Sequence, residues 1–373
     1  MNDFSQAKPR SIPPFRYDIV GSFLRPIELK HARRLFEEGQ LSQAQLTEVE
    51  DEHISALIKK QKEMGLLAVT DGEFRRSWWH LDFFWGIGGA QKVEMKQTVS
   101  VAGMQTKPQS FEIVDKLSYK THPMVTHFKQ LRQLAGNYPV KFAIPSPSLF
   151  HFVSLQHGNK IYDNAEQFKA DIVAVYQAAI QDFYDAGCRY LQLDDTAWGN
   201  LCSSRHRIHL KAQGYDPDQL VKDYVQMLND SIANRPDDMV ITLHVCRGNL
   251  HSTWFASGGY EPVAEQLFGQ VNVDGFFLEY DNERSGGFEP LKYIKDQQVV
   301  LGLVTTKHGG LESKEMLKAR IAEAANYVDI NQLCLSPQCG FASSEEGNIL
   351  TEEEQWDKIK LVVETAKEVW GDH

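Results

Sequence analysis

The chain has 373 residues, of which 42% are hydrophobic, so it can bury the core of one large domain or two ordinary ones. Its formal net charge is −11, and no block of lysine and arginine stands out, which argues against a nucleic-acid or membrane-surface partner. Residues 1–14 form a loose polar segment without the apolar core of a signal peptide, and no apolar run approaches the roughly 18 residues of a membrane helix. Five cysteines do not make a disulfide framework in so long a chain, so we expect a cytoplasmic enzyme.

The N-terminal part predicts two short strands that end in turns, with two helices between them. The expected ranges are 17–21, 27–38, 43–64 and 66–70. The first strand ends at Ser22, and the second breaks into a glycine turn that carries Asp71 and Glu73. Polar and apolar residues then alternate over 88–120 on both sides of Gly103, which predicts a β-hairpin insertion.

Beyond this insertion the chain alternates between apolar strands and amphipathic helices. Strands are expected at 140–146, 190–195, 239–246, 275–281, 299–306 and 333–340. Helices are expected at 163–186, 216–233, 260–268, 289–295, 313–326 and 351–369. With the two N-terminal strands this makes eight strand–helix units, which predicts an α/β fold: a single (β/α)8 TIM barrel over 1–373. The alternative is an open doubly wound sheet, but the chain contains no glycine-rich phosphate loop.

Potential metal ligands stand at the ends of three predicted strands. His244 and Cys246 are separated by one residue, so they point to the same side of their strand. Glu279 ends the next strand, and Cys339 ends the last one. The C-terminal ends of barrel strands meet at one rim, where these side chains can converge. An imidazole, two thiolates and a carboxylate suit Zn²⁺, so the sequence predicts a zinc site.

The carboxylate is the most exchangeable ligand in this set. If Glu279 leaves, a substrate atom can enter, and a zinc ion with soft ligands lowers the pKa of a substrate thiol. The predicted chemistry is therefore alkyl transfer to sulfur. A barrel with a purely structural zinc is the alternative that has no catalytic role.

Six motifs resemble those of the catalytic C-terminal barrel of cobalamin-independent methionine synthase, and more closely those of its short stand-alone relatives. They are Ile19-Val-Gly-Ser22, Asp71-Gly-Glu73, Leu191-Gln-Leu-Asp194, His244-Val-Cys246, Leu278-Glu279 and Ser336-Pro-Gln-Cys339-Gly. The resemblance covers essentially all of 17–370. It implies methyl transfer from 5-methyltetrahydrofolate to homocysteine, which gives methionine.

The resemblance also implies roles for individual residues. The zinc ligands would be His244, Cys246, Glu279 and Cys339. Glu73 and Asp194 would receive the amino group of homocysteine, in keeping with the attraction of an ammonium for carboxylates. The Gly21-Ser22 turn would receive its carboxylate. The partners implied are small molecules, and a homo-oligomer is left open.

The chain departs from the family on the methyl-donor side. Where the full-length enzymes carry an Asp-Ile-His element after strand 7, this chain reads Thr305-Thr-Lys307-His308, so Lys307 and His308 are the candidate proton donors. The folate-stacking tryptophan after strand 3 is replaced by Pro145-Ser-Pro-Ser148. The donor therefore stays open between folate, a corrinoid and another methyl compound. Another small thiol, such as coenzyme M, is the alternative acceptor.

Some neighbouring residues have two interpretations. Trp78, Trp79 and Trp85 either line the donor cleft or pack beneath a loop. Arg25 pairs either with the substrate carboxylate or with a nearby glutamate. Asp71 takes part in the site or only stabilises the turn before Glu73.

Overall fold

The computed structural model describes residues 4–94, 100–101, 104–105, 109–156 and 158–372. Its centre is a six-stranded parallel sheet with the strand order β10-β9-β8-β7-β6-β5. The strands are β5 (Phe142–Pro145), β6 (Tyr190–Asp195), β7 (Val240–Val245), β8 (Gly275–Glu279), β9 (Gln298–Val304) and β10 (Leu333–Pro337). Nearly every residue in them is buried, as expected for parallel strands that are covered on both faces. These six predicted strands are confirmed to within a few residues.

The two predicted N-terminal strands are present only as isolated parallel bridges. Tyr17 bridges Leu335 of β10, and Val69 bridges Val140 just before β5. A third bridge joins Ser22 to Gly72. The strands stay short because side chains take the backbone N–H groups that a ladder would use. The N–H of Ile19 donates to Asp18 Oδ1 at 2.8 Å, and that of Thr70 donates to Gln61 Oε1 at 3.0 Å.

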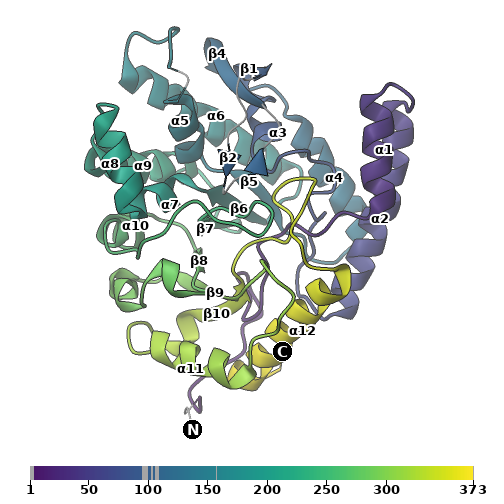
Figure 1. The fold of residues 1–373 in the computed structure, drawn as a ribbon, viewed down its shortest axis with the longest axis vertical. Coiled ribbons are helices and arrows are strands. Elements are labelled where there is room, and N and C mark those ends of the chain that lie inside the picture. The colour runs from purple at the N-terminus through teal and green to yellow at the C-terminus, as the bar shows by residue number, and fades with distance from the viewer. Residues whose placement is uncertain (1–3, 95–99, 102–103, 106–108, 157, 373) are drawn as a thin grey trace.

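Helices surround the sheet (Figure 1). They are α1 (Ile27–Glu37), α2 (Gln43–Glu63), α3 (Leu81–Phe84), α4 (Pro123–Ala135), α5 (Pro147–Ser154), α6 (Ala165–Asp185), α7 (Ala197–Cys202), α8 (Ser204–Ala212), α9 (Pro217–Ile232), α10 (Ala264–Gln270), α11 (Lys314–Ala324) and α12 (Glu352–Trp370). Short 3-10 helices are η1 (Glu283–Ser285), η2 (Glu289–Tyr293) and η3 (Ile330–Gln332). The predicted helices are found, except that 289–295 is a 3-10 helix and 260–268 begins only at Ala264.

The sequence did not predict α3, α4, α5, α7 and α8. Helix α5 shows the reason for one of these failures. Ser146 caps it by accepting a hydrogen bond from the N–H of Leu149 at 3.0 Å, and Pro147 occupies the first turn. Almost all of its residues are buried, so it has no polar face and no helical hydrophobic period.

The segment 88–120 contains paired strands, as the alternation predicts. β1 (Gly88–Glu94) pairs antiparallel with β4 (Gln109–Ser118). β2 (Ser100–Val101) pairs antiparallel with β3 (Met104–Gln105). Gly103 lies outside the described residues, and the status of the segment as an insertion stays a prediction.

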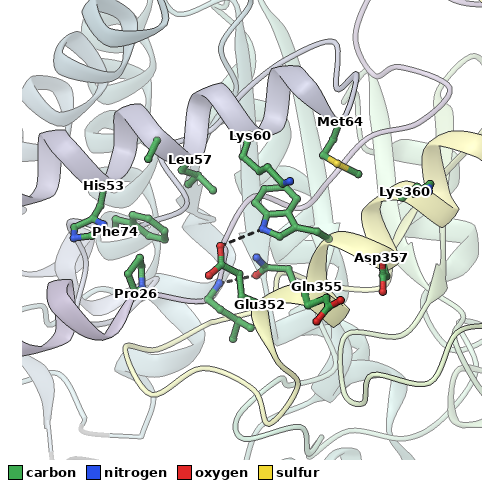
Figure 2. A pocket seen from close by; sticks show the side chains of 14 residues that line it. Pro26, His53, Leu57, Lys60, Met64, Phe74, Glu352, Gln355, Asp357 and Lys360 are labelled. Carbon is green, nitrogen blue, oxygen red and sulfur yellow. Dashed lines mark hydrogen bonds between the residues drawn. The ribbon is translucent and has the colours of Figure 1, made fainter.

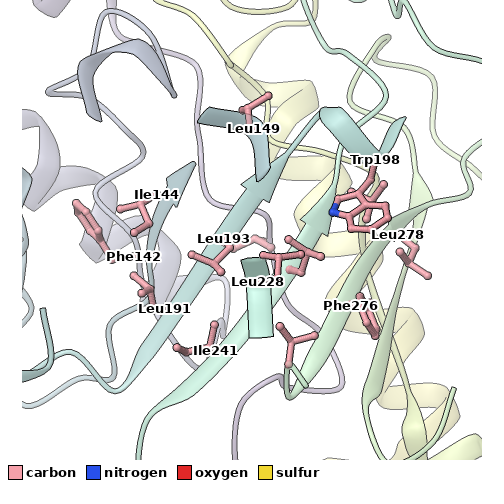
Figure 3. Close-up of a cluster of buried hydrophobic side chains, with 14 of the residues drawn as sticks. Phe142, Ile144, Leu149, Leu191, Leu193, Trp198, Leu228, Ile241, Phe276 and Leu278 are labelled. Atoms are coloured by element: carbon pink, nitrogen blue, oxygen red, sulfur yellow. The ribbon is translucent and has the colours of Figure 1, made fainter. Parts of the chain in front are cut away.

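The main hydrophobic core lies between the sheet and the helices. In Figure 3, Leu191, Leu193 and Ile241 lie on neighbouring strands, with Trp198 and Leu228 beside them. All five side chains are fully buried, and each contributes about 1.5–3 kcal/mol on leaving water. This packing fixes the strands whose ends carry the candidate site. Within the described part of the chain, no helix is both long enough and apolar enough to cross a membrane.

Candidate active site

The structure brings the four predicted zinc ligands together. His244 lies in β7, Cys246 directly follows it, Glu279 is the last residue of β8, and Cys339 stands two residues beyond β10. All four side chains are buried, and one ligand atom from each lies within 4.8 Å of the others. Their convergence follows from the parallel sheet, whose strands all end at the same edge.

The two thiols have the spacing that a tetrahedral zinc ion requires. Cys246 Sγ and Cys339 Sγ are 3.8 Å apart, and both cysteines are free thiols. Two sulfur atoms that each lie 2.3 Å from a tetrahedral ion are separated by roughly 3.8 Å. The N–H of Gly248 donates to Cys246 Sγ at 3.3 Å, which favours the thiolate form that binds metal.

His244 is oriented as a metal ligand would be. Its Nδ1 is 3.2 Å from the carbonyl oxygen of Phe277, which makes Nδ1 the protonated nitrogen. Its Nε2 is buried and has no hydrogen-bond partner of ordinary geometry among the described residues. A buried nitrogen without a partner is costly, and a metal ion would satisfy it.

Glu279 is fully buried, and both of its carboxylate oxygens are engaged. Oε1 accepts a hydrogen bond from the N–H of Arg247 at 2.9 Å, and Oε2 forms an ion pair with Arg284. Burial alone would raise the pKa of Glu279. The positive charges of Lys307, Arg284 and His244 outweigh that effect, and the pKa lies below its ordinary value. Glu279 is therefore an anion near neutral pH.

The ligand cluster favours a positive charge at its centre. Burial would lower the pKa of His244, but the Cys339 thiolate and the carboxylates of Asp194 and Glu279 raise it to about 9. A hydrogen bond from Cys246 holds the pKa of Cys339 well below its ordinary range and raises that of Cys246. Two thiols, an imidazole and a carboxylate in such surroundings fit a zinc ion.

The predicted substrate-binding residues line the same pocket as three of the ligands. The lining consists of residues from both groups and their neighbours: Val20, Ser22, Glu73, Trp79, Asp194, His244, Cys246, Cys339, Gly340 and Ser343. Glu279 is fully buried and is not among the residues that line the pocket. The pocket thus joins a candidate metal-binding cluster to two carboxylates that come from distant parts of the chain.

The turn before Glu73 places its side chain at the pocket. Gly72 and Glu73 have φ values of 65° and 62°, a conformation that is uncommon for a residue with a side chain. Asp71 Oδ1 accepts the Glu73 N–H at 2.9 Å, so Asp71 stabilises the turn. The Arg25 guanidinium donates to the backbone carbonyl oxygens of Glu73 and Arg76, so it helps to fix this turn. The unfavourable positive φ of Glu73 persists because these surrounding contacts hold the turn in place.

Glu73 and Asp194 form a buried acidic pair. Burial raises the pKa of Glu73 to about 7; Asp194 adds to the increase, and Arg76 opposes it. Burial also raises the pKa of Asp194 to about 6, against the opposing effects of His244 and Gln192. Glu73 Oε2 has no hydrogen-bond partner within the described residues. An ammonium group would supply the missing charge and donors.

Ser22 meets the residue that follows Cys339. The Ser22 hydroxyl accepts a hydrogen bond from the N–H of Ala342 at 3.3 Å. A Cβ at Gly340 would lie 1.9 Å from Ser22 Oγ, so only glycine allows this approach. The first segment of the chain is thereby fixed against the loop that carries Cys339.

The two predicted proton donors do not line this pocket. Lys307 is buried, and its amine has no hydrogen-bond partner within the described ranges. His308 is exposed. Lys307 influences Glu279 electrostatically, as noted above, but the structure gives neither residue a contact with the pocket, and their role stays a prediction.

Sequence reasoning did not single out Ser343 and left Trp79 ambiguous. Trp79 lines the pocket, and its backbone N–H donates to the Ser343 carbonyl oxygen at 3.3 Å. Trp78 and Trp85 instead donate their indole N–H groups to Gln109 and Ser110 of β4, each at 3.0 Å. The aromatic-rich stretch was a visible signal, but nothing in its residue pattern distinguishes its three tryptophans from one another.

A larger groove of about 840 Å³ lies elsewhere, between α2 and the start of α12 (Figure 2). Its lining includes Leu57, Lys60, Phe74 and Trp356. None of the predicted metal or substrate residues is among the described residues that line it. Size alone therefore does not identify the active site here.

Comparisons with known proteins agree with the sequence motifs. Residues 16–368 match the family model described as "Cobalamin-independent synthase, Catalytic domain". YxjH of Bacillus subtilis is 48% identical over 359 residues, which cover 96% of this chain and 95% of that protein. A methionine synthase of Pyrococcus abyssi is 23% identical over 88% of this chain and 87% of its own length.

Two solved structures share the fold. A candidate vitamin-B12 independent methionine synthase from Listeria monocytogenes has a TM-score of 0.78 at 42% identity, over 97% of this chain and 99% of that one. A B12-independent methionine synthase from Shewanella sp. W3-18-1, in complex with selenomethionine, has a TM-score of 0.68 at 19% identity, over 88% of this chain and 90% of that one. At this lower identity the second likeness shows the fold alone.

Proposed function

Because this chain belongs to the cobalamin-independent methionine synthase family, we propose that it transfers a methyl group to the thiol of homocysteine, giving methionine. We propose that His244, Cys246, Glu279 and Cys339 hold zinc for this reaction. One observation carries the proposal: a single pocket is lined by three of these ligands and by the residues expected to bind the amino acid. A substrate that is both an amino acid and a thiol needs a metal ion to bind its sulfur and polar residues to bind its amino and carboxylate groups.

Three residues would orient the amino acid. Glu73 and Asp194 would accept hydrogen bonds from its ammonium group, which balances two buried carboxylates with one positive charge. The Gly21-Ser22 turn would receive the carboxylate. The Shewanella relative holds selenomethionine, the selenium form of the proposed product, which supports an amino acid as the ligand class.

A zinc ion bound by this cluster would lower the pKa of the substrate thiol and so supply a sulfur nucleophile near neutral pH. The nucleophile would attack the donor methyl group in line, so that a carbon–sulfur bond forms as the bond from methyl to donor breaks. The leaving group would take a proton from Lys307 or His308. The buried amine of Lys307, close enough to Glu279 to lower its pKa, makes Lys307 the better placed of the two.

The donor side of the site is less similar to the family. 5-Methyltetrahydrofolate is the proposed donor, with a related methyl compound as the alternative. In the segment that replaces the stacking tryptophan, the hydroxyls of Ser146 and Ser148 both donate to Asp195. These serines are therefore committed to fixing the start of α5, and donor contacts must come from other residues.

At the level of the fold, we propose a closed (β/α)8 barrel within a single domain over 1–373, with 88–120 as an insertion. The bridges at Tyr17 and Val69 support closure, because they lie at the two outer strands, β10 and β5, of the six-stranded sheet.

The test is a panel of donors and acceptors with purified, zinc-loaded protein. The donors are methyltetrahydrofolate with one and with three glutamates, methylcobalamin and S-methylmethionine; the acceptors are homocysteine and coenzyme M. Methionine formed from homocysteine supports the proposal. Methylation of coenzyme M alone, or equal activity after complete removal of zinc, overturns it.

X-ray absorption at the zinc edge separates a catalytic from a structural ion. An additional sulfur ligand on addition of homocysteine supports the catalytic role. An unchanged set of four ligands supports the structural alternative.

A further inference from the structure

The carboxylate of Glu279 differs from the other candidate ligands because strong donors already occupy it. Arg284 pairs with Oε2, and the N–H of Arg247 donates to Oε1 at 2.9 Å. In contrast, His244 Nε2 has no hydrogen-bond partner of ordinary geometry in the part of the chain that the structure describes. A metal ion must therefore compete for Glu279 with a buried guanidinium.

Arg284 is itself held firmly in place. Its Nη1 lies 2.7 Å from Asp281 Oδ1, and its guanidinium lies 5.1 Å from the centre of the Trp254 ring. Its backbone N–H donates to Asn282 Oδ1 at 3.0 Å, in the short helix η1. The side chains of Arg284, Glu279 and Asp281 are almost completely buried. Arg284 cannot move into solvent without exposing two buried carboxylates.

This arrangement provides two favourable surroundings for the Glu279 carboxylate. Beside Arg284 it has a charge-assisted hydrogen bond; beside a metal ion it would have a coordinate bond. When Glu279 turns toward the metal, Arg284 keeps Asp281 as an anionic partner, so no buried charge is left uncompensated. The cost of moving Glu279 in either direction is therefore small.

We infer that Arg284, anchored by Asp281, is a positioning residue that makes Glu279 the exchangeable ligand of the metal centre. The inference rests on the proposed function, because it assumes that the four residues hold zinc. It makes predictions with opposite signs. Removal of the Arg284 charge frees Glu279 to bind the metal and should strengthen metal binding. Removal of the Asp281 charge leaves Glu279 as the remaining anionic partner of Arg284 in this ion-pair group, which strengthens their pairing and should weaken metal binding.

The experiment measures Zn²⁺ affinity by competition with a chromophoric chelator, and homocysteine affinity on the zinc-loaded proteins. Arg284→Gln should bind Zn²⁺ at least tenfold more tightly than the unmodified protein and homocysteine about tenfold more weakly. Asp281→Asn should bind Zn²⁺ more weakly. Arg284→Lys, which keeps a charge without the planar fork, should fall between Arg284→Gln and the unmodified protein.

The matched control is Arg189→Gln, which breaks an exposed ion pair with Asp238 at 2.8 Å and should leave both affinities unchanged. If Arg284→Gln and Asp281→Asn both weaken Zn²⁺ binding, the cluster has only a structural role and the inference is overturned. Unchanged affinities in both variants overturn it as well. If Arg284→Gln does not fold, Arg284→Lys and Asp281→Asn still test whether the two changes shift the Zn²⁺ affinity in opposite directions.

The failure of the proposed function has a different signature. In that case the unmodified protein itself retains no Zn²⁺, or its X-ray absorption at the zinc edge does not change when homocysteine is added. Both the proposed function and the inference about Arg284 are then overturned. A different result is that the unmodified protein binds both Zn²⁺ and homocysteine while Arg284→Gln and Asp281→Asn fail to change the Zn²⁺ affinity in opposite directions. In that case only the role of Arg284 is overturned.

Discussion

The Sγ atoms of Cys246 and Cys339 lie 3.8 Å apart, although 93 residues separate them in the chain. Cys246 follows β7 and Cys339 follows β10, and two other strands lie between these in the sheet. In a flat sheet, strands three places apart would be about 14 Å from each other. The strand ends and their loops therefore curve toward one another, and this curvature creates the candidate metal centre.

Replacement of either thiol should remove the metal. We expect about one zinc ion per chain in the purified protein and loss of most of it in Cys339→Ser or Cys246→Ser, because a serine hydroxyl is a poor zinc ligand. Elemental analysis by mass spectrometry after gel filtration measures this. Cys334→Ala is the control, since Cys334 is a buried free thiol outside the cluster. Full zinc content in Cys339→Ser would contradict the proposed ligand set.

The acidic pair should select amino-acid thiols. Glu73→Gln and Asp194→Asn each remove one charged acceptor for the ammonium group, which is worth about 1.5–3 kcal/mol. The KM for homocysteine should therefore rise roughly 10- to 100-fold in each variant. Steady-state kinetics against a matched thiol without an amino group, such as 3-mercaptopropionate, provides the comparison. If the KM for homocysteine does not change, the acceptor is not an amino acid.

Glu73 should also make the stability of the protein depend on pH. Its pKa is about 7 in the folded protein, above the value of 4.5 for an unperturbed glutamate. A raised pKa gives stability that is complete below the unfolded pKa and is lost as pH rises through the folded pKa. Ionisation of the buried Glu73 carboxyl above pH 7 thus lowers the free energy of unfolding by about 3 kcal/mol.

Glu73→Gln removes this cost. The variant should gain free energy of unfolding relative to the unmodified protein between about pH 5 and 7, with a constant difference at higher pH. Urea denaturation at several pH values, in the presence of a chelator, measures the difference. A difference that does not vary with pH would show that Glu73 has the same pKa in the folded and unfolded chain.

Gly340 should be irreplaceable while Ser22 is present. Gly340→Ala places a Cβ 1.9 Å from Ser22 Oγ and should destabilise the fold by about 1–3 kcal/mol, with a fall in metal content. Ser22→Gly in the same chain removes the side chain that the new methyl group meets. The double variant should therefore recover stability, as measured by thermal unfolding. Additive losses in the two variants would rule out a direct contact.

The sequence predicted the sheet well because parallel strands are apolar throughout, as in β9, where every residue is buried. It predicted the ligand cluster because spacing and strand ends are visible in sequence. It failed at residues 17–21 and 66–70, where Asp18 and Gln61 side chains replace ladder hydrogen bonds. A single apolar pattern does not reveal such local competition.

The loop residues of the pocket were harder to predict for a different reason. Ser343 lies in a loop, and Trp79 lies just before the four-residue helix α3, so neither follows a hydrophobic period. Their place in the pocket depends on tertiary contacts such as the bond from the Trp79 N–H to the Ser343 carbonyl oxygen. His308 illustrates the opposite problem, because a position after a strand predicted a pocket residue and the structure leaves it exposed.

The parallel bridge between Tyr17 and Leu335 has a consequence for how the protein is made. At about 5–20 residues per second, the ribosome adds Leu335 roughly 15–60 s after Tyr17. The segment that contains Tyr17 therefore lacks its partner until 318 further residues have been added. Ser22 belongs to that early segment and Cys339 to the late one, so a nascent chain cannot assemble the pocket. The candidate metal centre is consequently complete only after Cys339 has been synthesised, so shorter nascent chains do not present all four candidate ligands to zinc.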